Sequence, residues 1–88
     1  MKTIDEITFY PANSDFCGNP RAIVHFLEFL KDSERDLSID EQYETAKERA
    51  HKLGFKVYRG KDFGGGFIRQ CWSETKLKKE IAEFINNI

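Results

Sequence analysis

A stripe of apolar positions between residues 38 and 53 has the spacing of an amphipathic helix. Its members are Ile39, Tyr43, Ala46, Ala50 and Leu53, separated by four, three, four and three residues. Charged residues fill many of the positions between them, so one face should pack on a core and the other should meet water. Ser38 and Glu41 form a capping-box pattern at the start, and Gly54 follows the end. The pattern predicts a helix over 38–53.

A second stripe of the same kind lies near the end of the sequence. It consists of Leu77, Ile81, Phe84 and Ile88, at spacings of four, three and four. Ser73 is available to cap this segment, because a serine side chain can accept the unpaired N–H groups of a first helical turn. The pattern predicts a second helix that begins after Ser73.

Four apolar segments predict strands over 4–10, 21–30, 55–59 and 66–72. The first is expected to stop at Pro11, and the turn-rich loop PANSDFCGNP follows it. The segment RAIVHFLEFL is apolar at nearly every position, so periodicity cannot distinguish a strand from a helix. Pro20 at a first helical position would favour a helix. The density of Ile, Val and Phe favours a strand buried on both faces, and we predict a strand.

The predicted order is strand, strand, helix, strand, strand, helix. This ββαββα order implies an α+β fold with a small, mainly antiparallel four-stranded sheet and two helices on one face. The other face would be bare and available to a partner or a second copy of the chain. Both predicted hairpin loops contain Asp-Phe-x-Gly, at 15–18 and 62–65. Either the chain is a tandem ββα repeat of 1–54 and 55–88, or the likeness is chance, because Gly and Asp are common in turns.

Composition indicates one soluble globular domain. The 88 residues are 40% hydrophobic and 14% aromatic, which suffices for one core. Cys17 and Cys71 form no CxxC pair, so we expect free thiols and no metal or disulfide. No apolar run resembles a signal peptide or a membrane span, and we expect a cytoplasmic protein that needs no cofactor.

The net charge of −1 conceals an uneven distribution. Residues 1–55 carry 7 basic and 11 acidic side chains, whereas residues 56–79 carry 7 basic and 2 acidic ones. The basic region is suited to an anion, and the acidic remainder would repel a long polyanion. Nucleic acid is therefore not the favoured partner.

The segment VYRGKDFGGGFIRQC raises the question of what three consecutive glycines do. One hypothesis is an anion nest, in which the amides of Gly64, Gly65 and Gly66 face a phosphate. The alternative is a hairpin loop with a glycine bulge. The segment is not a Walker motif, because no Gly-Lys-Ser/Thr follows.

Basic and aromatic side chains near the two loops are the other candidate binding residues. The basic ones are Arg21, Arg59, Lys61 and Arg69, and the aromatic ones are Phe16, Phe63 and Trp72. Guanidinium groups suit phosphate or carboxylate, and aromatic rings can stack on a base. Alternatively, Arg21 pairs with Asp15 or a neighbouring acid, and the aromatic side chains, including the flanking Tyr10 and Tyr58, close one end of a small core.

No residue stands out as catalytic. His25 shares a strand face with Arg21 and Ile23, and a lone His there is more often a hydrogen-bonded core residue than a catalyst. A cysteine nucleophile with His25 as its base would need a third orienting group, which the sequence does not reveal.

The stretches NPRAIVHFL and YRGKDFGGGF resemble an unnamed group of small proteins of phages and other mobile elements. The resemblance covers most of the chain. It implies a host-modulating or counter-defence role, in which such proteins bind a host factor or sequester a nucleotide signal without catalysis.

We therefore expect a small non-enzymatic binding protein. In the leading hypothesis, loops 15–21 and 59–69 lie together and contact an anionic group, which is a nucleotide, a phosphate or an acidic protein patch. The alternatives are a protein–protein inhibitor that uses the bare sheet face or the acidic helix, and a small hydrolase or nuclease that uses His25 with Asp15 and Asp62. A homodimer is compatible with each.

Overall fold

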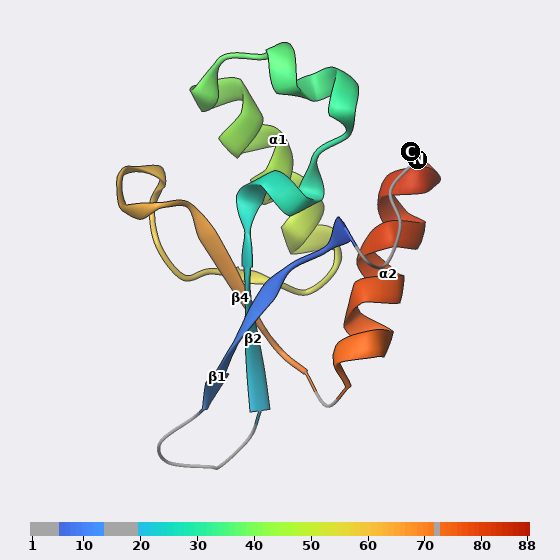
Figure 1. Cartoon of the computed structure of the whole chain (residues 1–88). Helices are drawn as coiled ribbons and strands as arrows, with labels where there is room; N and C mark the ends of the chain where they lie inside the picture. The colour runs from blue at the N-terminus through green and yellow to red at the C-terminus, as the bar shows by residue number, and fades with distance from the viewer. Residues whose placement is uncertain (1–5, 14–19, 72) are drawn as a thin grey trace.

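The computed structural model describes residues 6–13, 20–71 and 73–88. It confirms the predicted α+β architecture, with two α-helices and a four-stranded antiparallel sheet (Figure 1). The strands are β1 (Phe9–Asn13), β2 (Pro20–His25), β3 (Lys56–Val57) and β4 (Gly66–Gln70), and the helices are α1 (Ile39–Lys52) and α2 (Glu74–Asn86). The short 3-10 helices are η2 (Phe26–Phe29), η3 (Asp32–Asp36) and η4 (Lys61–Phe63). The strand order is β1-β2-β4-β3. The single domain and the internal repeat stay predictions.

Both α-helices pack on the same face of the sheet, as predicted. Val24 of β2 is paired with Phe67 of β4, and both side chains are completely buried on this face. Tyr43 of α1 stacks on the ring of Phe67, with 5.9 Å between the ring centroids. From α2, the Lys78 ammonium lies 5.8 Å from the ring centroid of Phe9. Because side chains alternate along a strand, the residues between these positions point to the opposite, open face.

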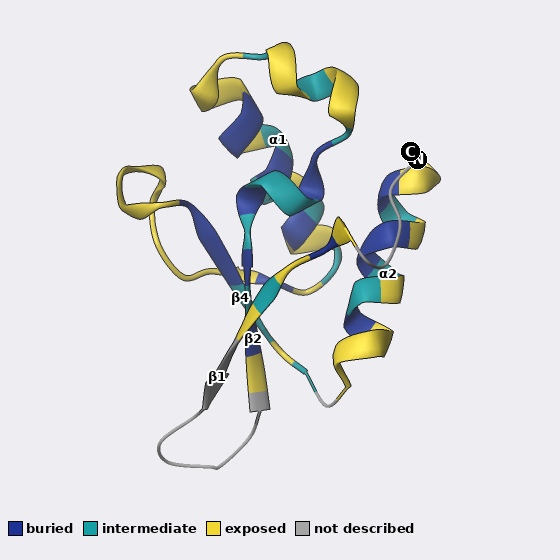
Figure 2. Cartoon of the chain, viewed as in Figure 1, coloured by how far each residue is buried: buried dark blue, intermediate teal, exposed yellow. Residues whose placement is uncertain are grey.

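The core is centred on Phe29 of η2, which is fully buried. Its ring makes edge-on contacts with Phe55 and Phe67, at centroid distances of 5.1 and 5.6 Å. Edge-to-face geometry is the preferred arrangement of aromatic pairs and adds to the stabilisation from burial. The dark blue segments of Figure 2 lie where β2, β4, η2 and the two α-helices meet.

A charged cluster holds η3 against α1. Arg49 donates two hydrogen bonds of 2.6 Å to the carboxylate of Glu34 and one of 2.9 Å to the carbonyl of Phe29. Glu34 also accepts the N–H of Lys31 at 2.7 Å. The hydrogen bond from Arg49, rather than the cost of burial, dominates here and lowers the pKa of Glu34. A bidentate pair of this kind fixes both orientation and distance, so it positions the irregular segment between β2 and α1.

The predicted helix caps are confirmed. The Ser38 hydroxyl accepts the N–H of Glu41, and the Ser73 hydroxyl accepts the N–H of Lys76, each at 3.3 Å. Both helices then run for more than a dozen residues. No helix in the described part of the chain is long and apolar enough to cross a bilayer.

The predicted apolar stripes need correction at their ends. Ile39 is 61% exposed, although Tyr43, Ala46 and Ala50 of that stripe are buried. On α2 the buried residues are Leu77, Ile81, Ala82 and Ile85. Phe84 is only partly buried, and Ile88 is exposed because α2 ends at Asn86.

The boundaries of all four strands also differ from the prediction. β1 begins at Phe9 rather than at residue 4, and β4 ends at Gln70 rather than at residue 72. β2 ends at His25, and η2 follows where the strand was expected to continue to residue 30. β1 continues through Pro11 to Asn13. Proline is tolerated there because β1 is an edge strand, where a missing N–H removes no ladder hydrogen bond on the outer side. β3 is only two residues long.

Candidate functional site

The open face of the sheet, opposite the two α-helices, carries several of the predicted site residues and others that the sequence did not indicate. The pairing of strands places Tyr10, Ile23, Ile68 and Lys56 in one row across the four strands. Arg21 and Gln70 are paired in the next row toward one end of the sheet, and His25 and Gly66 are paired toward the other end. Arg21, Ile23 and His25 therefore share a face, as the sequence predicted.

Three aromatic side chains on this face are exposed: Tyr10 by 62%, Tyr58 by 47% and Phe63 by 75%. They surround a hollow of about 370 Å³, which we call the aromatic hollow. Its lining includes Tyr10, Ile23, His25, Tyr58, Phe63 and Gly66. Arg59 also lines it, with its guanidinium carbon 5.4 Å from the centroid of the Tyr58 ring. The rings of Tyr10, Tyr58 and Phe63 therefore do not close the core as their alternative interpretation required.

The glycine loop uses its main chain for internal hydrogen bonds. The N–H of Gly64 donates to the carbonyl of Lys61 at 3.3 Å, and the N–H of Gly65 donates to the carbonyl of Gly60 at 3.1 Å. Gly64 and Gly65 have φ angles of +102° and +55°. Such angles favour glycine whatever the ligand, because a Cβ would be strained there. This geometry favours the turn interpretation over the anion nest.

The strand ends that bracket the two predicted loops lie at opposite ends of the sheet. Asn13 and Pro20 are paired beside the end of β4 at Gln70, whereas the glycine loop leads into Gly66, opposite the end of β2. Five residue steps along β2, from Pro20 to His25, separate these ends, which is about 17 Å. The described ends of the two loops therefore do not meet at a common rim. Residues 14–19, with Asp15, Phe16 and Cys17, lie outside the described residues, as does Trp72.

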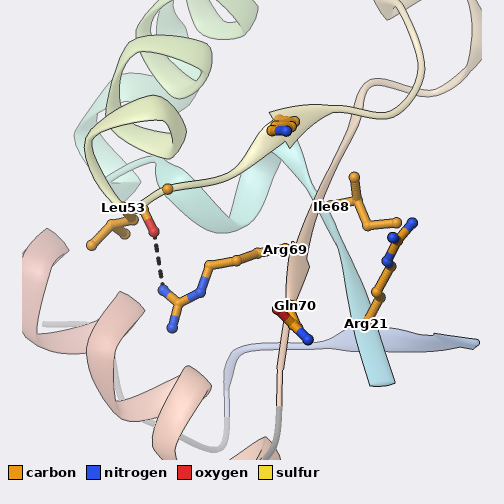
Figure 3. Close-up of a pocket in the computed structure, with 7 residues that line it drawn as sticks. Arg21, Leu53, Ile68, Arg69 and Gln70 are labelled. Atoms are coloured by element: carbon orange, nitrogen blue, oxygen red, sulfur yellow. Dashed lines mark hydrogen bonds between the residues drawn. The ribbon is translucent and has the colours of Figure 1, made fainter. Parts of the chain in front are cut away.

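Two of the four basic candidates have internal partners. Arg69 points to the helical face, where it forms an ion pair of 2.6 Å with Glu80 and donates to the carbonyl of Leu53 at 3.0 Å (Figure 3). Lys61 forms an ion pair with Asp40, and this hydrogen bond is the main cause of the raised pKa of the Lys61 ammonium. Neither side chain is therefore oriented toward a ligand on the open face.

Arg21 and Arg59 remain exposed, and Lys56 joins them on the open face. Among the described residues none of the three forms an ion pair. Arg21 and Lys56 line a second hollow of about 560 Å³, which we call the basic hollow, together with Leu53, Gly54, Ile68, Arg69 and Gln70. Two of the predicted basic residues, Arg21 and Arg69, therefore line the same hollow. Figure 3 shows Arg21 and Ile68 on one side of β4 and the Arg69 guanidinium on the other. Lys56 was missed as a site residue, because its row could only be known from the strand pairing.

His25 has a structural role at the end of β2. Its Nδ1 atom accepts the N–H of Leu27 at 3.2 Å and caps η2. Burial is the main cause that lowers its pKa. The charge of Glu28 and a backbone hydrogen bond with Gly64 raise the pKa less strongly, and the charge of Arg35 lowers it by the smallest amount. The lone pair that a general base would use is engaged in the cap. This geometry supports the hydrogen-bonded histidine rather than the catalytic one.

The remaining candidate chemistry is limited. Cys71 is a free, partly buried thiol whose Sγ lies 3.1 Å from the carbonyl of Ser73. Asp62, the described acid of the hydrolase hypothesis, is exposed in η4. Within residues 6–13, 20–71 and 73–88, no group of three or more His, Cys, Asp or Glu side chains is placed to hold a metal ion.

The chain was compared with curated proteins, solved structures and models of protein families. Neither the curated proteins nor the solved structures gave a match. One family model matches residues 2–87, and its description is Staphylococcus phage terminal repeat-encoded protein TreK. This match confirms the resemblance to small phage proteins, and it covers nearly the whole chain. The protein therefore belongs to the TreK family of Staphylococcus phage proteins.

Proposed function

We propose that this protein is a non-enzymatic binding protein whose open sheet face docks on an acidic surface of a protein in the cytoplasm of the host cell. The observation that carries the proposal is the group of exposed aromatic side chains around the aromatic hollow. Tyr10, Tyr58 and Phe63 expose apolar rings that folding alone would tend to bury. Tyrosine and arginine side chains are the residues most often found at the energetic centre of protein interfaces.

Charge favours an acidic partner. The charged side chains on the described strand positions of the open face are Arg21 and Lys56, and Arg59 lies two residues after the end of β3. The whole chain has a net charge of −1, so the positive charge of this face is opposite in sign to the net charge of the molecule. Complementary charge of this kind steers association and excludes partners of the wrong sign.

A long nucleic acid is a poorer partner for the same face. Such complexes depend on many phosphate contacts, and five other basic side chains are already in ion pairs: Arg49, Lys52, Lys61, Arg69 and Lys78. The exposed side of α1 adds Glu44 and Glu48, which would repel a polyanion.

A single nucleotide is the second candidate. Tyr58 and Phe63 are placed to stack on a base, and Arg59 lies beside them. Its phosphates would have to be held without the amides of Gly64 and Gly65, which donate within the loop.

The family supports a partner in the host, because its description names a Staphylococcus phage. A host-modulating or counter-defence role is consistent with either occupant.

Site-specific photo-cross-linking in staphylococcal cells tests the proposal. A benzophenone amino acid is placed at Tyr10 or Phe63 on the open face and, as the control, at Glu48 on α1. All three side chains are exposed, so the fold should tolerate each replacement. We expect light-dependent protein adducts from the first two positions and none from the third. Adducts from Glu48 alone, or adducts removed by ribonuclease, would overturn the proposal.

A further inference from the structure

Gly66 lines the aromatic hollow and has no side chain to occupy it. Gly66 begins β4 opposite His25, and its carbonyl accepts the N–H of Tyr58 at 3.0 Å. Gly66 thus lies between His25 of β2 and Tyr58, which follows β3. A Cβ on Gly66 would project toward this face, 3.3 Å from Cγ2 of Ile23. The absent side chain therefore leaves a floor of bare main chain.

The size and walls of the hollow suit one planar apolar group. Its volume of about 370 Å³ is near the lower limit of small-molecule sites. Its walls include the rings of Tyr58 and Phe63, and aromatic rings contact one another favourably by their edges and faces. A single aromatic side chain inserted into such a pocket is the usual form of an interface anchor.

The basic hollow lies next to this pocket. Arg21, Lys56, Ile68 and Gln70 line it from the open face, and Leu53, Gly54 and Arg69 line its other side. Ile23, which lines the aromatic hollow, is paired with Ile68, which lines the basic hollow. Along β4, Gly66 is two residues from Ile68 and four from Gln70, or about 7 and 13 Å. An extended partner segment advances by the same distance per residue. An acidic side chain two to four residues from the anchor would therefore lie over Lys56 and Arg21.

We infer that the partner presents an extended segment with one aromatic side chain for the aromatic hollow and a carboxylate two to four residues away for the basic hollow. The inference rests on the proposed function and specifies the chemistry of the partner. Charge complementarity supports it, because Arg21 and Lys56 have no acidic neighbour among the described strand residues of this face. An extended polypeptide also matches the linear separation of the two hollows.

Selection from a displayed library of random 12-residue peptides tests the inference with a defined probe. The purified protein should enrich peptides in which an aromatic residue precedes or follows an acidic residue by two to four positions. A synthetic peptide of the enriched sequence should bind the Gly66→Ala variant about tenfold or more weakly, because the added methyl group fills the floor of the hollow.

The matched control is Gly60→Ala. Gly60 has a φ angle of −73°, and a Cβ there meets nothing within 4 Å, so binding should be unchanged. A second variant, Lys56→Glu, should shift the enriched acid to a basic residue. Circular dichroism confirms that each variant is folded.

Enriched peptides without this spacing, no enrichment at all, or equal binding to Gly66→Ala and Gly60→Ala would overturn the inference. If the peptide experiment fails in one of these ways but Tyr10 and Phe63 still give photo-cross-links to a protein, the open face binds a protein, and only the inferred partner segment is wrong. If the cross-links are also absent, the proposed function fails as well. Competition of the selected peptide by a nucleotide would indicate that the hollow takes a base instead.

Discussion

Alanine substitutions in the loop between β3 and β4 should have three different effects on stability. Gly60 has an ordinary φ angle of −73°, and a Cβ there meets nothing within 4 Å. Gly64 has a φ angle of +102°, and a Cβ also meets nothing. Gly65 has a φ angle of +55°, and its Cβ would lie 2.5 Å from Cδ1 of Phe26, which is buried. The series separates backbone strain from steric overlap.

The expected losses follow from these contacts. Gly60→Ala should change the free energy of unfolding little, or raise it by about 0.4–1 kcal/mol, because alanine restricts the unfolded chain. Gly64→Ala should lower it by about 1–2 kcal/mol, the cost of a left-handed conformation for a residue with a Cβ. Gly65→Ala has the same cost and also forces Phe26 to move, which adds about 1–3 kcal/mol. Its total loss should be about 2–5 kcal/mol.

Thermal unfolding followed by circular dichroism measures the series. In a domain of this size 1 kcal/mol corresponds to about 4–8 °C in the melting temperature. Gly65→Ala should therefore melt at least about 8 °C below the wild type. The melting temperature of Gly64→Ala should lie between those of Gly65→Ala and the wild type. Equal stability of the Gly64 and Gly65 variants would refute the packing of Phe26 against the loop. Unchanged stability of both would refute the structural role of the glycines.

Two further predictions concern charged side chains. Glu34→Gln should lower the free energy of unfolding in urea by about 1–3 kcal/mol, because the bonds from Arg49 lose their charged acceptor. Since Arg49 lowers the pKa of Glu34, this stabilisation is complete above about pH 4.5 and is lost as the pH falls through the folded pKa. If the free energy of unfolding of the variant falls as much below about pH 4.5 as that of the wild type does, the prediction is contradicted. Burial lowers the pKa of His25, so the unfolded chain binds more protons and stability should fall as the pH decreases below about 6.5. His25→Asn keeps an acceptor for the N–H of Leu27 but does not titrate, so its urea midpoint should fall less between about pH 7 and pH 5.5; an equal fall would exclude His25 as the cause.

The helices were predictable because their signals are local. A cap is formed by residues three positions apart, as with Ser38 and Glu41, and an apolar stripe follows from the helical period. The strand pair that encloses the glycine loop was predictable for the same reason, since its turn residues lie between two short apolar segments.

The irregular part between β2 and α1 was not predictable from local patterns. The run from Arg21 to Leu30 is apolar almost throughout, so no period marks the change from strand to 3-10 helix after His25. The change depends on distant contacts, including the bond from the N–H of Phe26 to the carbonyl of Gly65. Pro11 was similarly misleading, because an edge position cannot be recognised before the strand order is known.

The candidate site was predicted only in part for the same reason. Sequence proximity placed Arg69 with the glycine loop, but strand alternation turns its side chain toward Glu80 on the helical face. Lys56 and Tyr10 are far apart in the sequence, yet they share one row of the sheet with Ile23 and Ile68. The bare face itself was expected, and its aromatic hollow becomes visible only when Gly66 is paired with His25.

The central claim is that the open face, rather than α1 or the glycine amides, is the binding surface. The most direct measurement is a structure of the protein bound to the host protein identified by cross-linking. We predict that the partner buries Tyr10, Tyr58 and Phe63 and places carboxylates near Arg21 or Lys56. A complex in which these aromatic side chains stay exposed while the partner covers Glu44 and Glu48 on α1 would contradict the claim.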